Sequence, residues 1–511
     1  MLRMHKKSHG ETGKIKKIFQ ENMVFVVSFG MVTVIALLGL TASEAFDSYA
    51  RKLMAFLKEY FSWMYLLVMF LVVIFLLVLA FSKYGAIRLG ADDSRPEYST
   101  LSWFAMLFCA GMGVGLVFWG IAEPLSHYVN PIGGVEPMTE EAARFAIRSS
   151  FMHWGLQPWG AYSIIGLGLA YFQFRKKQPG LISSICTPII GEKGVKGAAG
   201  KVIDIFSIIM SVAGVAASFG IGCLQISGGL NFLWGVPNRA VTWLIIITIV
   251  CLIYLASSIG GLDKGIKKLS DINLCLAGFL MCLAFLIGPT TDILNIFTNG
   301  IGEYLSCFIS DSLGINPFGE NEWVGAWKVF YWAWWIAWAP LVGIFIARIS
   351  KGRTIREFIL GVMAAPTLAS AVWFSVFGGM ALHVTDRFTS EQLTLITASP
   401  ETAPFIIYTQ YPLGTLLSVI TIIVLIIFFI TSADSATFVL SMLSSEGNMN
   451  PPNLKKVVWG IMQALIAFVL LYSGGVSALQ TASIASAFPF MFIIVIACVS
   501  LAKSLKSENK I

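Results

Sequence analysis

Charged residues are scarce in this 511-residue sequence. Asp, Glu, Lys and Arg together make up 12% of it, whereas they make up about 25% of an average soluble domain. Hydrophobic residues reach 57%, and the mean hydropathy is +0.78. A large soluble protein with an unusually apolar core is excluded, because many separate runs reach about 20 apolar residues, the length that crosses a bilayer. The sequence therefore predicts an all-α membrane protein that crosses the bilayer many times.

The sequence also lacks the cysteine and histidine patterns of disulfide frameworks, metal sites and catalytic centres. The eight cysteines are scattered, mostly inside apolar runs, and form no CxxC pair. His127, His153 and His383 lie far apart in the chain, beside no Ser or Cys nucleophile and no acidic metal motif. We therefore expect neither an enzyme nor a cofactor. A sensor without transport would be expected to carry a soluble output domain, which we do not find in the sequence.

The apolar runs divide into twelve expected membrane spans, which the positive charges between them orient. The expected spans are 22–42, 61–82, 101–121, 150–174, 203–232, 240–257, 270–288, 327–347, 358–384, 413–443, 457–474 and 482–501. Of the 35 Lys and Arg residues, 27 fall in the two tails and in every second loop, and 7 fall in the other loops. Because positive charge is retained in cytoplasmic loops, both ends of the chain are predicted to be cytoplasmic.

This charge distribution accounts for the net charge of +7, so we expect no nucleic-acid partner. The basic N-terminal tail is instead expected to contact anionic membrane lipid. The first apolar run after it is a full span with no small-residue cleavage pattern behind it, so we expect no removable signal peptide. The C-terminal tail is only about ten residues long, and activation through a long charged tail is therefore not expected.

Two of the expected spans are irregular, and they lie five spans apart in opposite orientations. Span 101–121 contains GMGVGLVFWG, and span 327–347 contains FYWAWWIAWAP, in which aromatic residues crowd ahead of Pro340. Two five-span units of opposite orientation are typical of an inverted-repeat secondary transporter. We expect a cytoplasmic tail at 1–20, two additional transmembrane helices at 21–100, a first five-helix repeat at 101–289, an extracytoplasmic connecting segment at 290–326, a second five-helix repeat at 327–501 and a short cytoplasmic tail at 502–511.

The three glycines within residues 111–115 are expected to free the backbone for a ligand. Glycine in a helix interior costs up to about 1 kcal/mol relative to alanine, so three together indicate a stronger requirement than helix stability. In hydrocarbon every backbone group must be paired, and an unwound stretch survives only where it lines a cavity or coordinates a ligand. Close helix packing of the small-xxx-small kind is the alternative, which the glycines alone leave open.

Aromatic residues on two spans favour a cavity for a particular class of ligand. HWGLQPWGAY (153–162) carries Trp154, Trp159 and Tyr162 on one broad helix face, and span 327–347 carries several more indoles. A cage of indole faces suits a quaternary ammonium, which donates no hydrogen bond and is held by cation–π attraction. No carboxylate is required, and acids inside the expected spans are scarce, Asp434 being the clearest. A core role or an interfacial belt is the alternative for the outermost rings.

Four stretches together resemble the betaine/choline/carnitine transporter family. They are AGMGVGLVFWGIAEPL (110–125), HWGLQPWGAY (153–162), FYWAWWIAWAPLVGIFIARISKGRTIREF (330–358) and TSADSATFVLSMLSS (431–445). The likeness runs in order from about residue 20 to 500, and it is strongest to the sodium-coupled glycine betaine importers of Gram-positive bacteria. It implies an osmoprotective symporter of the cell membrane that works by alternating access. It further implies twelve transmembrane helices, a LeuT-like 5+5 inverted repeat preceded by two extra helices, and a homotrimer.

The resemblance also assigns the substrate-binding residues. It implies an aromatic box for the trimethylammonium group at Trp154, Trp159, Tyr162 and Trp335, a path-lining role for Trp338, and a place for the substrate carboxylate beside Gly113 and Gly115. Choline-preferring relatives tend to carry Asp at the position of Gly115, so the glycine favours betaine over choline.

One sodium ion is implied as the coupling ion, between spans 101–121 and 413–443. Its expected ligands are the carbonyls of Cys109, Met112 and Phe428 and the side chains of Thr431 and Ser432. Carbonyl and hydroxyl oxygens are the hard ligands that a small cation needs. For the two hydroxyls, back-bonding to the preceding helical turn is the alternative. Asp434 follows closely, either as a structural hydrogen-bonding group or as a charge near the ion.

The sequence departs from the family's pattern at a second proposed sodium site, which aligns with Ser211, Val215 and Leu341. Val215 offers no oxygen and Leu341 no ring, so we do not expect a second sodium bound in the same way. One sodium suffices, because a potential of about 100 mV and a tenfold gradient together supply about 3.7 kcal/mol.

Lys267 aligns with an arginine that replaces sodium in carnitine antiporters. A lysine at the end of a span is also explained by the retention of positive charge on the cytoplasmic side. A sodium-independent or proton-coupled carrier or exchanger of carnitine or choline is therefore the alternative function.

Overall fold

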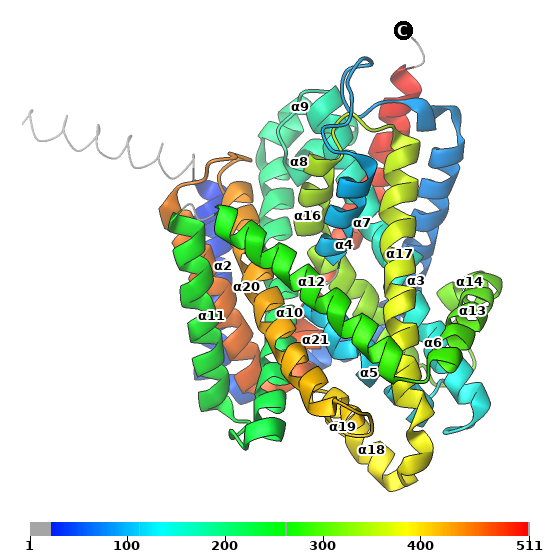
Figure 1. Ribbon diagram of the computed structural model, residues 1–511. Helices are drawn as coiled ribbons and strands as arrows, with labels where there is room; N and C mark the ends of the chain where they lie inside the picture. The colour runs from blue at the N-terminus through cyan, green and yellow to red at the C-terminus, as the bar shows by residue number, and fades with distance from the viewer. Residues whose placement is uncertain (1–21, 112, 261–262, 509–511) are drawn as a thin grey trace, which may run out of the picture.

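The part of the chain that the structure describes is helical almost throughout. The computed structural model describes residues 22–111, 113–260 and 263–508 (Figure 1). Within these ranges the only β-structure is an isolated antiparallel bridge between Arg88 and Thr354. The seven cysteines whose side chains are described are all free. The prediction of an all-α chain is confirmed.

The long helices follow one another with short connections. Their bounds are α2 Met23–Thr41, α3 Ser43–Phe81, α4 Thr100–Gly111, α5 Val114–Val129, α6 Glu140–Trp154, α7 Leu156–Ala170, α10 Ala198–Trp234, α11 Ala240–Gly260, α12 Asp263–Ile287, α13 Thr290–Ser306, α16 Phe330–Ile349, α17 Ile355–His383, α20 Gly414–Leu443 and α21 Asn453–Glu508. Shorter helices are α8 Ile182–Ile185, α9 Thr187–Lys196, α14 Phe308–Leu313, α15 Glu322–Val324, α18 Ser390–Ala398 and α19 Ala403–Tyr408. Single turns lie at η1 Lys83–Ala86, η2 Tyr171–Arg175, η3 Gly325–Val329 and η4 Thr385–Arg387.

Nine helices among the described residues are long and apolar enough to cross a membrane. The protein is therefore a multi-pass membrane protein. Twelve spans were expected, and the difference has a structural origin. Spans 101–121 and 150–174 are each divided between two shorter helices, α4 with α5 and α6 with α7. The last two expected spans share α21, which kinks at Gly475 where φ is +58°.

Glycines lie at both of the divided spans. Gly113, which precedes α5, has extended backbone angles (φ −129°, ψ −170°), and Met112 before it lies outside the described residues. Gly155 separates α6 from α7 with φ −100° and ψ −134°. A Cβ atom on Gly155 would lie 2.4 Å from the carbonyl oxygen of Phe151 and 2.6 Å from the hydroxyl oxygen of Tyr304, so only glycine fits there. Each break leaves backbone groups at a helix end without intrahelical partners.

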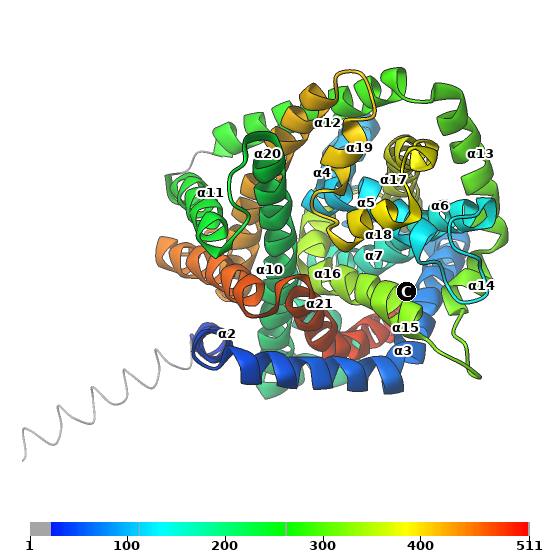
Figure 2. The same cartoon turned by 90° about the horizontal axis from the view of Figure 1, so that it is seen from below.

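The helices α5, α7 and α16 lie inside the helix array, whereas α2, α3, α11, α12 and α13 lie at its periphery (Figure 2). In the most apolar stretch of Glu322–Ile349, which includes α16, 83% of the residues are buried, against 22% for α11. The backbones of α7 and α16 approach closely, because a Cβ atom on Gly343 would lie 2.8 Å from Cγ2 of Ile165 and 3.1 Å from the backbone nitrogen of Gly166. The buried centre therefore brings together the two spans that carry the aromatic residues predicted for the substrate site.

Glu508, the last residue of α21, ties this helix to two segments far away in sequence. Its carboxylate accepts a hydrogen bond from the Tyr171 hydroxyl (2.7 Å) and pairs with Nε of Arg175 (2.7 Å) and Nζ of Lys176 (2.8 Å). The guanidinium of Arg175 also pairs with the carboxylate of Asp92, at 2.8 Å. The side chain of Glu508 is only 9% exposed, so this network is largely shielded from solvent.

Replacing Glu508 with Gln is expected to lower the free energy of unfolding by about 1–3 kcal/mol. The substitution removes the charge that Arg175 and Lys176 share, while only exposed Asp92 remains as a carboxylate partner for Arg175. The thermal unfolding midpoint in detergent measures the effect. Glu192→Gln is the matched control, since Glu192 is exposed on α9 and makes no ion pair within the described ranges. Equal midpoints for the two variants would show that the network does not hold α21.

Candidate functional site

A cavity of about 80 Å³ lies at the start of α5, where α6, α7, α10, α16 and α20 converge. Seven residues predicted for the substrate or sodium site line it: Gly113, Gly115, Trp154, Tyr162, Trp335, Trp338 and Ser432. The rest of its wall consists of Val114, Leu116, Ser218, Phe219, Trp334 and Val342. The structure therefore brings residues from spans 101–121, 327–347 and 413–443 to one cavity.

Aromatic rings meet at nearly right angles along this cavity. The ring centroids of Trp335 and Trp154 are 5.0 Å apart with an interplanar angle of 88°, and those of Trp335 and Tyr162 are 5.5 Å apart at 70°. Trp334 lies 6.1 Å from Trp154 at 89°. Rings set at right angles enclose a volume on several sides, as a cation–π cage requires. Trp159 is buried and packs edge-on against Tyr162 at 5.5 Å, but it is not among the lining residues.

Hydrogen bonds at the indole nitrogens hold three of these rings in place. Trp335 donates to the backbone carbonyl of His153 at 2.9 Å. Trp334 and Trp338 both donate to the hydroxyl of Ser218, at 3.1 Å and 2.9 Å. An indole anchored at its only polar atom cannot rotate freely, so the orientation of each ring is set by a neighbouring helix.

Gly115 allows the rings to come close to the backbone of α5. A Cβ atom at this position would lie 2.4 Å from Cη2 of Trp334 and 3.1 Å from Cη2 of Trp154. Gly115 is the second residue of α5, so its N–H belongs to the first turn, where N–H groups have no intrahelical acceptor and the helix dipole is positive. The wall of the cavity thus combines aromatic rings with the start of a helix, which attracts an anionic group.

The residues predicted for sodium are only partly described. Met112 lies outside the described residues, and Cys109 is placed in α4 by its backbone alone. The hydroxyl of Thr431 donates to the carbonyls of Ile427 (3.0 Å) and Phe428 (3.3 Å) in the same helix. Phe428 also borders a second small cavity, of about 20 Å³, together with Gly113. The oxygen-bearing turn of α20 therefore lies beside the break that precedes α5.

The remaining sequence candidates lie away from the cavity lining. Ser211, on α10, is buried and its hydroxyl has no hydrogen-bond partner in the structure, whereas Val215 and Leu341 are buried apolar residues. Lys267 is exposed on α12. Asp434 is half-buried on α20. None of these five residues belongs to the wall of the ring-lined cavity.

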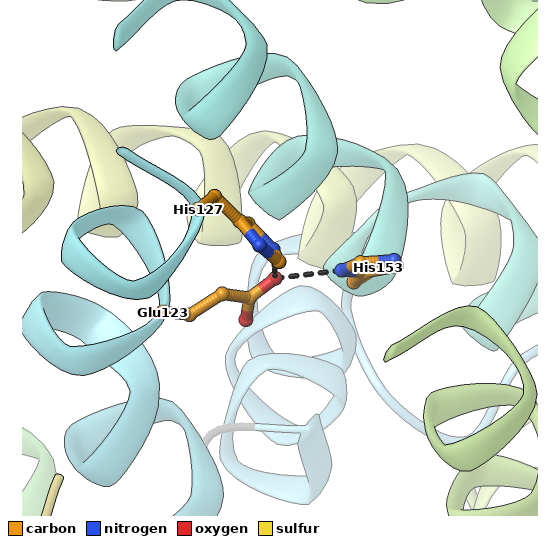
Figure 3. A group of neighbouring side chains, drawn as sticks. All are labelled: Glu123, His127 and His153. Carbon is orange, nitrogen blue, oxygen red and sulfur yellow. Dashed lines mark hydrogen bonds and ion pairs between the residues drawn. The ribbon is translucent and has the colours of Figure 1, made fainter. Parts of the chain in front are cut away.

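Sequence reasoning missed Glu123, a completely buried carboxylate on α5 (Figure 3). Its Oε1 atom lies 2.7 Å from Nδ1 of His153 and 3.3 Å from Nε2 of His127. The expectation that these histidines have no acidic neighbour is therefore wrong, because α5 and α6 pack together and bring them to one oxygen. Asp434 is likewise not the clearest acid inside a span. The sequence did contain a signal for this site. The apolar stretch GLVFWGIAEPL includes one carboxylate, and it lies four residues before a histidine on the same helix face.

Glu123, His127 and His153 could hold a metal ion by residue type, since their ligand atoms all lie within 4.8 Å of one another. Metal-bound imidazoles almost always donate their other N–H to an acceptor that orients them. Here Nδ1 of His127 and Nε2 of His153 have no hydrogen-bond partner in the structure. A hydrogen-bonded network with the carboxylate as acceptor fits these residues better than a metal centre.

Comparison with known proteins agrees with this geometry. The chain matches the family described as BCCT, betaine/carnitine/choline family transporter, over residues 23–510. It is 46% identical to the glycine betaine transporter OpuD of Bacillus subtilis, with 95% of each chain covered. It is 43% identical to an ectoine/hydroxyectoine transporter of Virgibacillus pantothenticus (96% and 97% covered) and 38% identical to glycine betaine transporter 1 of Vibrio parahaemolyticus (96% and 94% covered). The chain therefore belongs to the betaine/carnitine/choline transporter family, and it is a transporter rather than an enzyme.

Proposed function

We propose that this transporter imports glycine betaine, or a closely similar trimethylammonium solute, across the cell membrane by sodium-coupled alternating access. The observation that carries the proposal is the set of steeply inclined rings of Trp154, Tyr162 and Trp335 along one cavity. Glycine betaine transporters among the relatives support the same substrate class. Accumulating such a solute would serve osmotic balance.

The proposed pose follows from the two kinds of group in the cavity wall, the aromatic rings and the start of α5. The trimethylammonium group lies among the rings, with Trp159 supporting Tyr162 from behind and Trp338 on the path. The three ring faces of Trp154, Tyr162 and Trp335, at about 0.5–2 kcal/mol each, supply about 1.5–6 kcal/mol before losses. The carboxylate lies at the start of α5, beside Gly113 and Gly115, where N–H groups and the helix dipole favour an anion.

The proposed architecture is twelve transmembrane helices arranged as two inverted five-helix repeats after two extra helices. Support comes from the broken helix α4/α5 near the buried centre, since discontinuous helices form the binding sites of such transporters. The expected counterpart in the second repeat, span 327–347, is not broken, because α16 is one helix from Phe330 to Ile349. The distribution of Lys and Arg supports a cytoplasmic location for both termini. We also propose the family's homotrimer, with the peripheral helices in contact with lipid or with other protomers.

Sodium would bind between the break before α5 and the turn of α20 at Phe428, Thr431 and Ser432, together with the carbonyls of Cys109 and Met112. Support comes from the position of this turn, because Phe428 and Gly113 border the same small cavity. The hydroxyl of Thr431 is back-bonded to the carbonyls of Ile427 and Phe428 in the structure, and it would exchange these bonds for the ion. A second ion at Ser211, Val215 and Leu341 is not proposed, because the latter two side chains bear no oxygen. One sodium is sufficient, since about 3.7 kcal/mol sustains a several-hundredfold gradient of a zwitterion.

Uptake of labelled glycine betaine into proteoliposomes tests the proposal. We expect accumulation above the external concentration with an inward sodium gradient, and only equilibration when sodium is equal on both sides. Equal accumulation in the two conditions would contradict sodium coupling. Uptake that depends on internal carnitine or choline, or on a proton gradient, would favour the alternative, a sodium-independent exchanger or proton-coupled carrier.

The substitution Thr431→Val is expected to raise the half-saturating sodium concentration about tenfold, because it removes one of few oxygen ligands while keeping the side-chain shape. The sodium dependence of initial uptake measures this effect. Ser418→Ala is the matched control, because Ser418 is also a back-bonded hydroxyl on α20, donating to the carbonyl of Gly414 at 2.9 Å, but it lies several turns away. A similar shift in both variants would indicate a general effect on the helix and contradict a sodium ligand at Thr431.

A further inference from the structure

The buried carboxylate of Glu123 is directly connected to the ring-lined cavity. Its Oε2 atom accepts a hydrogen bond from Nε1 of Trp154 at 2.9 Å and another from the hydroxyl of Tyr331. Its Oε1 atom is contacted by the imidazoles of His153 and His127. Each oxygen therefore has two partners, and all five side chains are buried.

These contacts fit an ionised carboxylate. An indole N–H can only donate, and an ionised carboxylate offers about four acceptor positions. Neutral imidazoles can each direct their single N–H at Oε1, since the other nitrogen of each ring has no partner in the structure. Four donors then fill the four positions of Glu123, and the network carries one net negative charge. No Lys or Arg forms a salt bridge with Glu123 among the described residues.

Trp154 spans the distance between this charge and the substrate. Its Nε1 edge is bonded to Glu123, while the opposite edge, at Cη2, lies 3.1 Å from where a Cβ atom of Gly115 would be. The same indole lines the cavity and stands perpendicular to Trp335. A cation in the cavity beside these rings is thus separated from the carboxylate by the width of one indole.

We propose that Glu123 is a positioning and specificity-determining residue that fixes Trp154 and places a negative charge behind it, so that the cavity selects cationic head groups over neutral ones of the same shape. This inference rests on the proposed function, because it deepens the role of the same aromatic site. The aromatic cage therefore does not act alone. A fixed charge supplies part of its preference for a cation without touching the substrate.

The size of the effect follows from the separation of the charges. An anion and a cation roughly 7 Å apart, in surroundings of intermediate dielectric constant, attract strongly enough to change binding on the order of tenfold or somewhat more. Hydrogen bonding to an anion also makes the indole more electron-rich, which strengthens attraction at its face. A purely structural role for Glu123 would instead weaken every ligand that fills the cavity, whatever its charge.

Glycine betaine and its carbon isostere 3,3-dimethylbutanoate separate these two roles. Both carry the carboxylate, and they differ only in the charge of the trimethyl group. Glu123→Gln keeps the shape and the acceptor for Trp154, but it removes the charge. We expect its dissociation constant for glycine betaine to rise about tenfold, while that for the isostere stays within about threefold or falls. Tryptophan fluorescence titration of the purified full-length transporter measures both. Equal weakening of the two ligands, or no weakening of either, would overturn the proposal.

Ser218→Ala is the matched control, because it removes a neutral hydrogen-bond partner from Trp334 and Trp338 and is expected to weaken both ligands by the same factor. If Glu123→Gln does not fold, Glu123→Asp provides the test. That variant keeps the charge, so the ratio of the two affinities should remain, and loss of the ratio would overturn the proposal.

Trp335→Leu distinguishes a failure of the aromatic site from a failure of the role proposed for Glu123. If it leaves betaine binding intact, the aromatic site itself is wrong. If it abolishes binding while Glu123→Gln keeps the normal ratio, only the role of Glu123 is wrong.

Discussion

Trp335→Leu is expected to lower the affinity for glycine betaine by about a hundredfold. The ring of Trp335 is central to the cage, since it lies 5.0 Å from Trp154 and 5.5 Å from Tyr162 and lines the cavity. Leucine retains part of the apolar surface but offers no π face. The loss combines about 2 kcal/mol of cation–π attraction with roughly 1 kcal/mol of ring–ring contact. Binding is followed by tryptophan fluorescence, and transport by uptake into proteoliposomes.

Trp159→Leu is the comparison that makes this result specific. Trp159 is as deeply buried as Trp335 and also contacts Tyr162, but it does not line the cavity. Its loss is expected to weaken betaine binding less than about tenfold, through a less well-supported Tyr162. Equal losses for the two variants would contradict the cavity as the place where the trimethylammonium group binds.

The positions of the helices could be predicted from the sequence wherever an apolar run matches the thickness of a bilayer. The predicted bounds are wrong where a helix extends beyond the apolar run. Helix α3 begins at Ser43 rather than near residue 61, because its first part is amphipathic and carries Asp47 and Arg51, which pair across one turn. The connecting segment 290–326 likewise contains α13, whose few buried residues, such as Ile293 and Tyr304, are too widely spaced to form an apolar run.

The aromatic residues of the candidate site could be predicted because tryptophan and glycine are conspicuous in the sequence, but their partners could not. Helical periodicity tells which residues of one helix share a face, and it does not tell which helix that face meets. Glu123 and His153 are 30 residues apart and meet only because α5 packs against α6. The place of Trp334 in the cavity wall could not be predicted either. Successive residues point about 100° apart on a helix, so a helix that directs Trp335 into the cavity is not expected to direct Trp334 there as well. Trp334 nevertheless reaches the cavity, because Gly115 has no side chain to block it.

The second large effect on transport is expected from replacing Gly115 with alanine. Alanine fits the helical conformation of this position, so its cost is purely steric. Its Cβ would lie 2.4 Å from Cη2 of Trp334, well inside van der Waals contact. Trp334 cannot move aside easily, because it stacks on Phe330 at 5.6 Å and its indole nitrogen is bonded to Ser218. The methyl group must therefore displace a ring into the cavity that the substrate needs.

We expect Gly115→Ala to lower glycine betaine uptake by at least about a hundredfold, while the free energy of unfolding falls by only about 1–3 kcal/mol, the usual cost of overpacking. Gly30→Ala is the matched control, because Gly30 lies in helix α2 with no atom within 4 Å of its added Cβ, and alanine there should keep full uptake and equal or greater stability. Uptake in proteoliposomes and thermal unfolding in detergent measure the two quantities separately. Normal uptake by Gly115→Ala would mean that the rings beside residue 115 can move without loss of substrate binding. The substrate would then have to bind elsewhere in the protein.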